Sequence, residues 1–451
     1  MEKKRNTFSG GLGFVLAAAG SAVGLGNIWR FPYLAAKHGG GIFLLVYIIL
    51  VFTFGYTLMT AENAIGRSSG KSPLDAFSVL NKKWGFVGVI ATVIPCIILP
   101  YYDVIGGWVL KYLLAYLTGS AGAAAGGTYF DDMLARPWVV LAGQTVFTLF
   151  NIVILLRGVQ KGVERVSTIL MPVLVILAIG ISVYSVTLPG AMAGVKYLFI
   201  PDISHFSISS VLAALGQMFY SLSLAMGIMI AYGSYLPKNS SLEKNVSKIE
   251  LFDTFIAIIA GLMIIPAVFA FSGGDSSALN SGPGLMFQTL PKVFASMPFS
   301  NVIGAAFFFL VLAAAITSSM SIMETIVACV CDHFKLDRKK AVLMVGGLSW
   351  LVSFLPSLGY SVLSGVKIFD FDILDFMDFI TNAVLMPICS LLICLFVTYG
   401  IGVAAVEKEV CVTGEFKRKK LFEIMIKYVA PIFVCAILIS SVLESFGIIT
   451  L

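Results

Sequence analysis

Apolar stretches of about 20 residues recur along almost the whole chain, and this feature restricts the possible folds more than any other. An α-helix of that length crosses the hydrocarbon core of a bilayer, so the pattern predicts an all-α polytopic membrane protein. The composition agrees, because 59% of the 451 residues are apolar or aromatic and only 12% are charged, which is unlike a water-soluble domain. The stretches do not alternate apolar and polar residues, which argues against an outer-membrane barrel.

The breaks between the apolar stretches predict eleven spans and no separate soluble domain. Residues 1–451 are therefore expected to form a single transmembrane domain. The predicted spans lie near 11–36, 41–66, 86–118, 137–156, 166–187, 207–236, 249–272, 300–331, 341–357, 372–403 and 421–447.

The positions of Lys and Arg predict the orientation in the plasma membrane. If the N-terminus is cytoplasmic, 23 of the 30 basic residues lie on the cytoplasmic side, as the positive-inside rule requires, and the C-terminus is extracellular. Since the basic residues fall in short clusters between spans, the net charge of +6 reflects topology and does not indicate a nucleic-acid partner. The seven cysteines and three histidines show no CxxC or other metal-site spacing. The oligomeric state is left open.

Two spans are predicted to be interrupted in mid-membrane. The first contains Gly20, Gly24 and Gly26 within seven residues, and each glycine lowers helix stability by about 1 kcal/mol relative to alanine. The sixth has a softer signal at the same depth, residues 221–227 with sequence SLSLAMG. Small residues also serve close helix packing, so this alternative stays open. If the helices do unwind, their free carbonyls suit a cation and their half-helix N-termini suit a carboxylate.

Breaks in two spans that lie five apart indicate an inverted repeat. The two halves are expected at about 8–190 and 205–403, with the span at 421–447 as an extra helix. Five-span halves are inserted with opposite orientation, so equivalent breaks meet at the centre of the membrane.

Several motifs resemble those of the neurotransmitter:sodium symporter family. They are GLGNIWRFPY at 24–33 with GGG at 39–41, YY at 101–102, GQMFYSLS at 216–223 and TSS at 317–319. The resemblance covers the chain, and the eleven spans with short loops are similar to the bacterial amino-acid transporters of the family. It implies a 5+5 inverted-repeat fold with broken helices 1 and 6. It also implies sodium-coupled symport of an amino acid by alternating access.

The resemblance also implies site residues, which we place at the matching positions. A first sodium ion would be bound by Ala22, Asn27, Ser221 and Asp253. A second would be bound by Gly20, Val23, Ala314, Thr317 and Ser318. Both sets offer only oxygen ligands, which suit a hard cation. The substrate would contact Ala22, Leu25, Gly26, Ile98, Tyr102, Phe219, Tyr220, Ser221, Ser223, Met226 and Ile322.

Two departures from the family pattern bear on specificity. Asp253 stands where the family often has Asn, and Ala257, one turn later, has no hydroxyl for an anion. We therefore expect no chloride requirement, although Asp253 could instead be a solvated acid near the end of its helix. Met226 stands where a leucine-transporting relative has an aromatic residue, and since methionine adapts to irregular volumes, we expect a hydrophobic or aromatic substrate.

Ionisable residues within membrane spans usually mark transport pathways. By resemblance, Arg30 and Asp378 would form an outer gate, and Glu62 would brace unwound backbone. An inner gate would consist of Arg5 and Asp332 with Tyr235 and Phe8 nearby, although two interfacial charges could also simply face water. Glu324 could line the inner water path, and no role follows for Asp103.

Three other functions are alternatives to symport: an ion channel, an enzyme and an amino-acid sensor. An ion channel would need a filter repeated around an axis, and the sequence has none. An enzyme is not expected, since motifs such as HExxH and GxxxxGK[ST] are absent. An amino-acid sensor built on a transporter scaffold remains an alternative.

Overall fold

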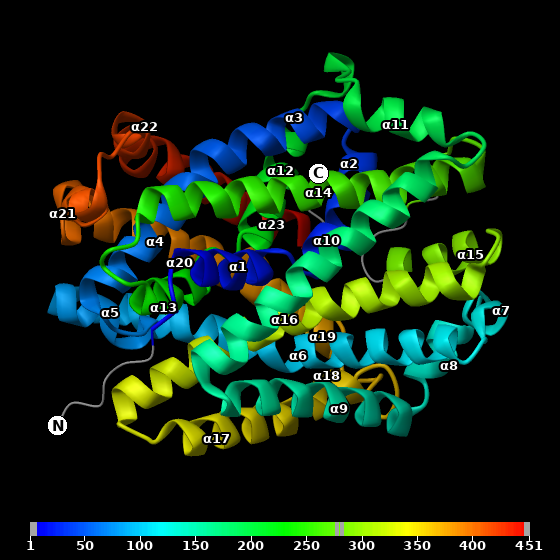
Figure 1. Cartoon of the computed structure of the whole chain (residues 1–451), viewed down its shortest axis with the longest axis horizontal. Coiled ribbons are helices and arrows are strands. Elements are labelled where there is room, and N and C mark those ends of the chain that lie inside the picture. Colours follow the sequence, from blue (N-terminus) through cyan, green and yellow to red (C-terminus); the bar gives the residue numbers. More distant parts are fainter. Residues whose placement is uncertain (1–6, 276–278, 280–283, 446–451) are drawn as a thin grey trace.

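The computed structural model describes residues 7–275, 279 and 284–445 of the chain. Within these ranges the chain forms helices and no β-sheet. Figure 1 shows the long helices α6 (Gly85–Leu117), α14 (Leu242–Ser272) and α16 (Ser300–Phe334) running roughly along the longest axis of the molecule, and α6 packs against α16. The fold is therefore the all-helical bundle that the apolar stretches predict.

The helices follow the predicted spans closely. Among the described residues, nine helices are long and apolar enough to cross a membrane, and the bent pair of Gly11–Ala22 and Gly26–Lys37 makes a tenth. The nine are Gly41–Ser69, Lys82–Leu117, Pro137–Leu156, Val159–Val186, Leu242–Ser272, Ser300–Phe334, Arg338–Leu358, Ile373–Gly400 and Lys419–Leu443. The remaining predicted span corresponds to two shorter helices, α12 (Ile208–Ser221) and α13 (Ile228–Tyr235), so the prediction of eleven spans is roughly consistent with the structure.

Two starts differ most from the prediction, each by seven residues: the span predicted from 166 begins at Val159, and α14, predicted from 249, begins at Leu242. Ser241 caps the helix by accepting a hydrogen bond from the Lys244 amide, and such a cap starts a helix ahead of the apolar stretch. Asp253 therefore lies in the helix interior and is fully buried. The alternative that it is a solvated acid at a helix end is wrong.

The first predicted break is confirmed. Helix α1 (Gly11–Ala22) ends partway along the predicted span, and the chain continues as a π-helical turn, η1 (Gly26–Arg30), and α2 (Phe31–Lys37). The two parts are bent by 54°. Val23 takes an extended conformation with ψ of 91°, so the backbone at the break leaves the helical hydrogen-bond pattern.

The second predicted break is confirmed as well. It separates α12 (Ile208–Ser221) from α13 (Ile228–Tyr235). Ser223 and Ala225 have left-handed φ angles of 53° and 62°, which are unfavourable for residues with a Cβ atom and occur mainly where surrounding structure enforces them. Glu62 provides such support, because its Oε1 atom accepts a hydrogen bond of 2.7 Å from the Ala225 amide. The predicted bracing role of Glu62 is confirmed.

The remaining helices pack against the two broken ones and against one another. Helix α4 packs against α13, α10 packs against α14, and α6 packs against α9 and α16. Their bounds are α3 Gly41–Leu50, α4 Tyr56–Ser69, α5 Pro73–Leu80, α7 Ala121–Ala124, α8 Tyr129–Leu134, α9 Pro137–Leu156, α10 Arg165–Val186, α11 Ala191–Phe199, α15 Leu290–Ala295, α17 Arg338–Val352, α18 Phe354–Leu358, α19 Ile373–Asp378, α20 Met386–Leu395, α21 Val403–Val410, α22 Lys419–Ile424 and α23 Ala430–Ser445.

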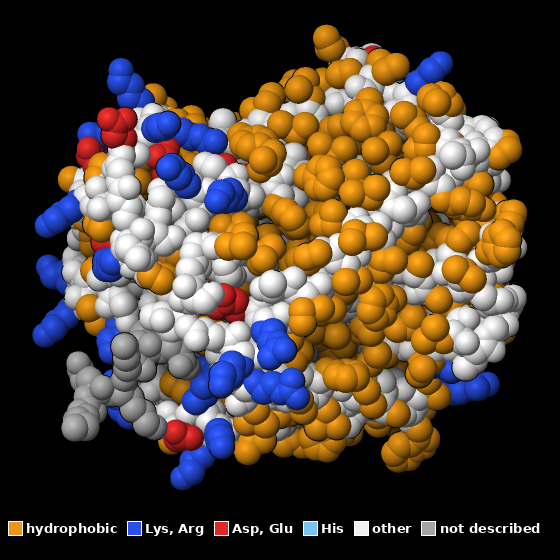
Figure 2. Space-filling view, viewed as in Figure 1, with side chains coloured by type: hydrophobic (Ala, Val, Ile, Leu, Met, Phe, Trp, Pro, Cys, Tyr) orange, Lys and Arg blue, Asp and Glu red, His pale blue; other side chains and the backbone are white. Residues whose placement is uncertain are grey.

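The surface separates into apolar and basic parts. Figure 2 shows a broad apolar face, and most of the Lys and Arg side chains in this view gather toward the end where Figure 1 places α5, α21 and α22. Large apolar side chains such as Leu149, Ile176 and Leu348 are exposed on the outer helices. A surface of this kind suits contact with lipid.

Candidate functional site

The two broken helices meet at a small internal cavity. Its free volume is about 30 Å³, which holds a water molecule but no larger solute. The lining residues are Ser21, Ala22, Gly24, Gly26, Ile98, Tyr102, Tyr220, Ser223, Met226, Ser318 and Ile322. A larger molecule therefore enters this central pocket only when lining side chains move, and Met226 is the most adaptable of them.

Most of the predicted substrate residues come together in this central pocket. Eight of the eleven line it. The amide of Leu25 lies beside it and donates a hydrogen bond of 3.5 Å to the Tyr102 hydroxyl. Phe219 lines a neighbouring cavity, and Ser221 belongs to a separate polar cluster. Leu25, Phe219 and Ser221 thus border the pocket but do not line it.

The two breaks are bonded to each other beside the pocket. The Ser223 hydroxyl donates a hydrogen bond of 3.1 Å to the Ser21 carbonyl, and the Ser21 hydroxyl lies 3.3 Å from the Ser223 hydroxyl. Gln217 donates from Nε2 to the Gly26 carbonyl at 3.0 Å. Unwound backbone is tolerated at this depth only where such partners are available.

A buried carboxylate, Asp253, lies next to the two breaks. Its oxygens accept hydrogen bonds from Asn27 Nδ2 at 2.9 Å, from the Ser221 hydroxyl at 2.8 and 3.0 Å, and from the Tyr47 hydroxyl at 3.0 Å. Tyr47 also donates to Ser221 at 3.1 Å. All four residues are buried. Three of the four residues predicted for the first sodium ion are therefore in direct contact, and the fourth, Ala22, lines the adjoining pocket.

The Asp253 cluster has the chemistry of a cation site. Each of its hydrogen-bond donors is neutral, and within the described part of the chain Asp253 forms no ion pair with a basic side chain. A buried charge without a partner is strongly unfavourable. Carboxylate, carboxamide and hydroxyl oxygens are ligands of hard cations, so the residues fit a sodium ion.

The residues predicted for the second sodium ion lie where α1 faces α16. The Ser318 hydroxyl donates to the Ser21 carbonyl at 3.1 Å and lies 3.5 Å from the Gly20 carbonyl. Thr317 donates to the Ala314 carbonyl at 3.1 Å. A Cβ atom at Gly20 would lie only 3.3 Å from Thr317 Cβ, so the glycine permits this close approach. Val23, at the end of α1, has the extended backbone described above.

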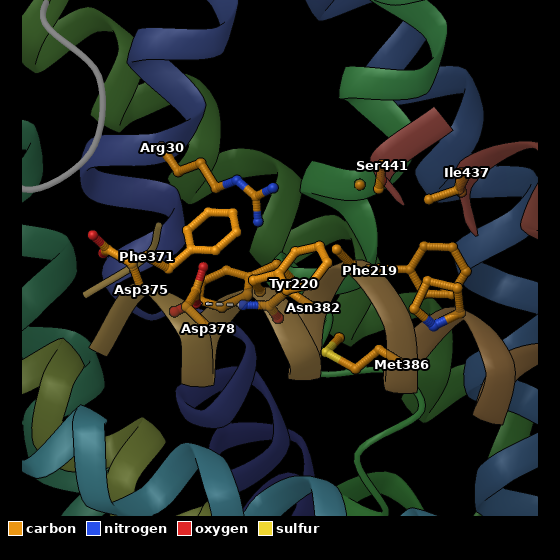
Figure 3. Close-up of a pocket in the computed structure, with 14 residues that line it drawn as sticks. Arg30, Phe219, Tyr220, Phe371, Asp375, Asp378, Asn382, Met386, Ile437 and Ser441 are labelled. Atoms are coloured by element: carbon orange, nitrogen blue, oxygen red, sulfur yellow. Dashed lines mark hydrogen bonds between the residues drawn. The ribbon is translucent and has the colours of Figure 1, made fainter. Parts of the chain in front are cut away.

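A larger cavity of about 310 Å³ adjoins the central pocket, and Tyr220 lines both. Arg30 and Asp378 lie on different sides of this vestibule, as Figure 3 shows. The Arg30 guanidinium lies 5.4 Å from the centre of the Tyr220 ring, a cation–π distance. Asp378 accepts hydrogen bonds from Tyr101 at 3.2 Å and Asn382 at 2.5 Å. Among the described residues, Arg30 and Asp378 form no direct ion pair. The two residues of the predicted outer gate therefore lie on either side of the vestibule, which is open between them.

The other predicted gate lies in a closely packed region. Phe8 is buried, and its ring packs edge-on against Tyr232 and Tyr235. The Tyr235 hydroxyl donates to Glu324 at 2.9 Å, and Glu324 pairs with Arg338 at 2.8 Å. In this conformation Glu324 is therefore buried, forms an ion pair with Arg338 and does not face water.

Only one half of the predicted inner ion pair can be described. Asp332 accepts a hydrogen bond of 2.8 Å from the Ser72 amide. Its predicted partner Arg5 lies outside the described residues. The pairing of Arg5 with Asp332 remains a prediction.

Sequence reasoning missed Tyr47 and Gln217 as site residues. Tyr47 donates to both Asp253 and Ser221, and Gln217 donates to the break in the first span. Both are polar side chains within apolar stretches, and this is the only feature of the sequence that could have indicated a role in the site. Nothing in the sequence tells which face of the helix such a residue occupies.

The comparisons with known proteins agree with this arrangement. The model of the sodium:neurotransmitter symporter family matches residues 5–130 and 137–448. The chain belongs to this family. A symporter-family relative, the sodium-dependent transporter YhdH of Bacillus subtilis, is 39% identical over 406 residues, which cover 89% of each protein. A sodium-dependent transporter of Methanocaldococcus jannaschii is 34% identical over 450 residues, covering 96% of this chain and 90% of the relative.

A solved structure is also similar to this chain. The crystal structure of MhsT in complex with L-phenylalanine matches with a TM-score of 0.87 and 38% identity, covering 97% of this chain and 100% of MhsT. The protein is therefore a multi-pass membrane transporter of the sodium-dependent type and not an enzyme.

Proposed function

We propose that this symporter couples sodium entry to the uptake of a hydrophobic or aromatic L-amino acid across the plasma membrane, without a chloride requirement. The observation that carries the proposal is the buried Asp253 carboxylate, which has only neutral donors and lies beside two broken helices. Its charge calls for a cation, and the adjoining pocket has room for the cation's organic partner once its side chains move. The solved relative MhsT binds L-phenylalanine, which favours an amino acid of this class.

Different residues around the pocket would bind the carboxylate, the ammonium group and the side chain of an amino acid. The amides of Leu25 and Gly26 begin the second half of the first span, where a helix N-terminus attracts a carboxylate, and the Tyr102 hydroxyl can donate to the same group. The carbonyls at the end of α12, from Phe219 to Ser221, can accept from the ammonium group. Ile98, Met226 and Ile322 supply the apolar walls that a hydrophobic side chain needs.

Two sodium ions per substrate provide enough energy for concentrative uptake. Entry of one ion down a roughly tenfold gradient releases about 1.4 kcal/mol, and a membrane potential of about 100 mV adds about 2.3 kcal/mol. Two ions can therefore drive accumulation of a zwitterion by about five orders of magnitude. We place the first at Ala22, Asn27, Ser221 and Asp253 and the second at Gly20, Val23, Ala314, Thr317 and Ser318.

Alternating access follows from the asymmetry between the two gates. The vestibule between Arg30 and Asp378 is open, whereas the packing around Phe8, Tyr235 and Glu324 is closed. We infer that this conformation faces outward, with the N-terminus in the cytoplasm. Closure of Arg30 onto Asp378, together with release of the packing at Phe8, would then expose the pocket to the cytoplasm.

Uptake of a labelled amino acid into proteoliposomes tests the proposal. We expect accumulation of a hydrophobic or aromatic L-amino acid above the external concentration when an inward sodium gradient is present, and none when potassium replaces sodium. Flux that never exceeds equilibration would indicate a channel. Substrate binding without exchange of internal for external substrate would indicate a sensor.

Substitutions at the two sodium sites should weaken sodium-dependent binding. Asn27→Leu removes a polar ligand that contacts Asp253, and Ser318→Ala removes the hydroxyl that faces Gly20 and Ser21. Loss of one ligand oxygen should raise the sodium concentration needed for half-maximal substrate binding about tenfold. Ser440→Ala is a matched control, because this buried hydroxyl donates only to a carbonyl of its own helix. Unchanged sodium affinity in both site variants would refute the assignments.

Replacement of chloride by gluconate should leave uptake unchanged. The fixed charge of Asp253 already provides the anion beside the first sodium ion, and Ala257, buried one turn later on α14, has no hydroxyl to hold chloride. The measurement is the initial rate of sodium-driven uptake in the two media at equal ionic strength. A clear fall in gluconate would show that the transporter uses chloride.

A further inference from the structure

A second buried carboxylate, Asp103, lies outside the central pocket. It is on α6, one residue after Tyr102, and is 1% exposed. Its position near the middle of a membrane span makes an isolated charge unfavourable. The proposed transport mechanism makes no use of this group.

Asp103 is surrounded by hydrogen-bond donors from three other helices. Its Oδ2 atom accepts from Thr148 at 2.9 Å and from Ser349 at 3.2 Å. Its Oδ1 atom accepts from Ser319 at 3.2 Å and lies 3.4 Å from Asn151 Nδ2. Thr148 and Asn151 belong to α9, Ser319 to α16 and Ser349 to α17. All five side chains are buried.

The described neighbours of Asp103 suit an ionised carboxylate but include no counter-ion. Each of the four can donate a hydrogen bond to the acceptor-only charged form. In the part of the chain that the structure describes, no basic side chain forms an ion pair with it. Neutral donors reduce the cost of burying a charge, but they do not balance it.

A second observation indicates a ligand at this place. The Asn151 side chain is 1% exposed, and its Oδ1 atom has no hydrogen-bond partner among the described residues. In this amide group it is Nδ2 that faces the cluster, where it donates to Ser319 at 2.8 Å and lies 3.4 Å from Asp103 Oδ1. Rotation of the amide would turn Oδ1 toward the centre of the cluster, where a cation would bind it. An orphaned buried carbonyl oxygen is unfavourable unless a partner is supplied.

The Asp103 cluster also repeats the chemistry of the Asp253 cluster. Each contains one carboxylate, one asparagine amide and hydroxyl groups, each is buried, and each has only neutral partners. Oxygen-only ligation of this kind suits a hard cation, and the single carboxylate of each cluster balances one positive charge. The Asp103 cluster adjoins the wall of the central pocket, since Tyr102 and Ser318, the residues preceding Asp103 and Ser319, line that pocket.

We propose that Asp103, Thr148, Asn151, Ser319 and Ser349 form an additional binding site for a hard monovalent cation. The bound cation neutralises Asp103 and ties α6, α9, α16 and α17 into one unit. Because Asp103 and Ser319 directly follow residues of the substrate and sodium sites, occupancy of this additional site sets the positions of Tyr102 and Ser318. The site thereby adds a cation to those of the proposed function without contacting the substrate.

Equilibrium binding of radioactive sodium to the purified full-length protein tests this inference, with radioactive rubidium, a potassium analogue, in a parallel experiment. The Asp103→Asn variant should bind one fewer of these cations per molecule than the wild type. Ser349→Ala keeps the carboxylate and should lower the affinity of one class of cation about tenfold. Ser440→Ala, which removes a buried hydroxyl far from the cluster in sequence, should bind as the wild type does.

The outcomes are distinct. If Asp103→Asn is folded, judged by its melting temperature and size-exclusion profile, and binds as much sodium and rubidium as the wild type, the inference is wrong. A change only in the pH dependence of the variant, with the cation count intact, would assign a proton to Asp103 and would also overturn it. If Asp103→Asn does not fold, Ser349→Ala and Thr148→Val decide, and unchanged cation affinity in both contradicts the site. Failure of the proposed function is a separate result, namely the absence of sodium-stimulated substrate binding in the wild type.

Discussion

Asp253→Asn is expected to weaken sodium-dependent substrate binding roughly 100-fold, because it removes the charge that balances a buried sodium ion. The substitution keeps the size of the side chain and much of its hydrogen bonding to Asn27, Ser221 and Tyr47. The effect therefore reports on charge and not on packing. The measurement is the sodium dependence of labelled amino-acid binding to the purified protein.

The same chemical change at the surface serves as a control for Asp253→Asn. Asp132 on α8 is exposed, so Asp132→Asn should leave the sodium dependence within about twofold of the wild type. If Asp253→Asn and Asp132→Asn behave alike, Asp253 does not bind sodium, and the central argument for cation coupling fails.

Gly26→Ala is expected to reduce substrate affinity more than tenfold. A Cβ atom at position 26 would lie 2.4 Å from Tyr220 Cδ1 and 2.6 Å from Cε1, so the ring must move. Since Tyr220 lines the central pocket, a shifted ring changes the space left for the substrate. Overpacking of this kind typically costs about 1–3 kcal/mol. The measurement is binding of the labelled amino acid at saturating sodium, compared with sodium binding in the absence of substrate, which should persist.

Gly216→Ala is the matched control for Gly26→Ala. Gly216 lies on α12 near the same vestibule, but the nearest atom to its added Cβ would be Arg30 Nη2 at 3.9 Å, an ordinary contact. We expect substrate affinity to stay within about twofold of the wild type. Equal losses in the two variants would show that the effect comes from any added methyl group in this region and not from the Tyr220 ring.

Most of the membrane spans could be predicted because burial in lipid depends on local composition. A helix in a bilayer satisfies its own backbone hydrogen bonds, so an apolar stretch such as residues 137–156 predicts its helix with no knowledge of neighbours. The start of α14 was misplaced because Ser241 and the polar turn after it form helix outside the apolar stretch. The break in the first span was visible from its closely spaced glycines, whereas the break at 222–227 depends on strained residues that Glu62 supports.

The candidate site was accessible to sequence reasoning mainly through resemblance. The motif at 24–33 and the runs at 216–223 and 317–319 led to residues that the structure gathers around one pocket. Tyr47 could not be predicted as a site residue, because it lies outside these motifs and its neighbours in the sequence are ordinary apolar residues. Asp103 was seen as a charge within a span but received no role, since its four partners come from three other helices.

The amino-acid sequence alone determined that this protein is an all-helical membrane protein, where its helices lie and where the first span breaks, because hydropathy and glycine content act over short distances. Only the tertiary structure decided which polar groups meet. The contact of Asp253 with Asn27 and Tyr47 and the ring of donors around Asp103 join residues from separate helices. Helix rotation and packing select such contacts, and no local pattern records them.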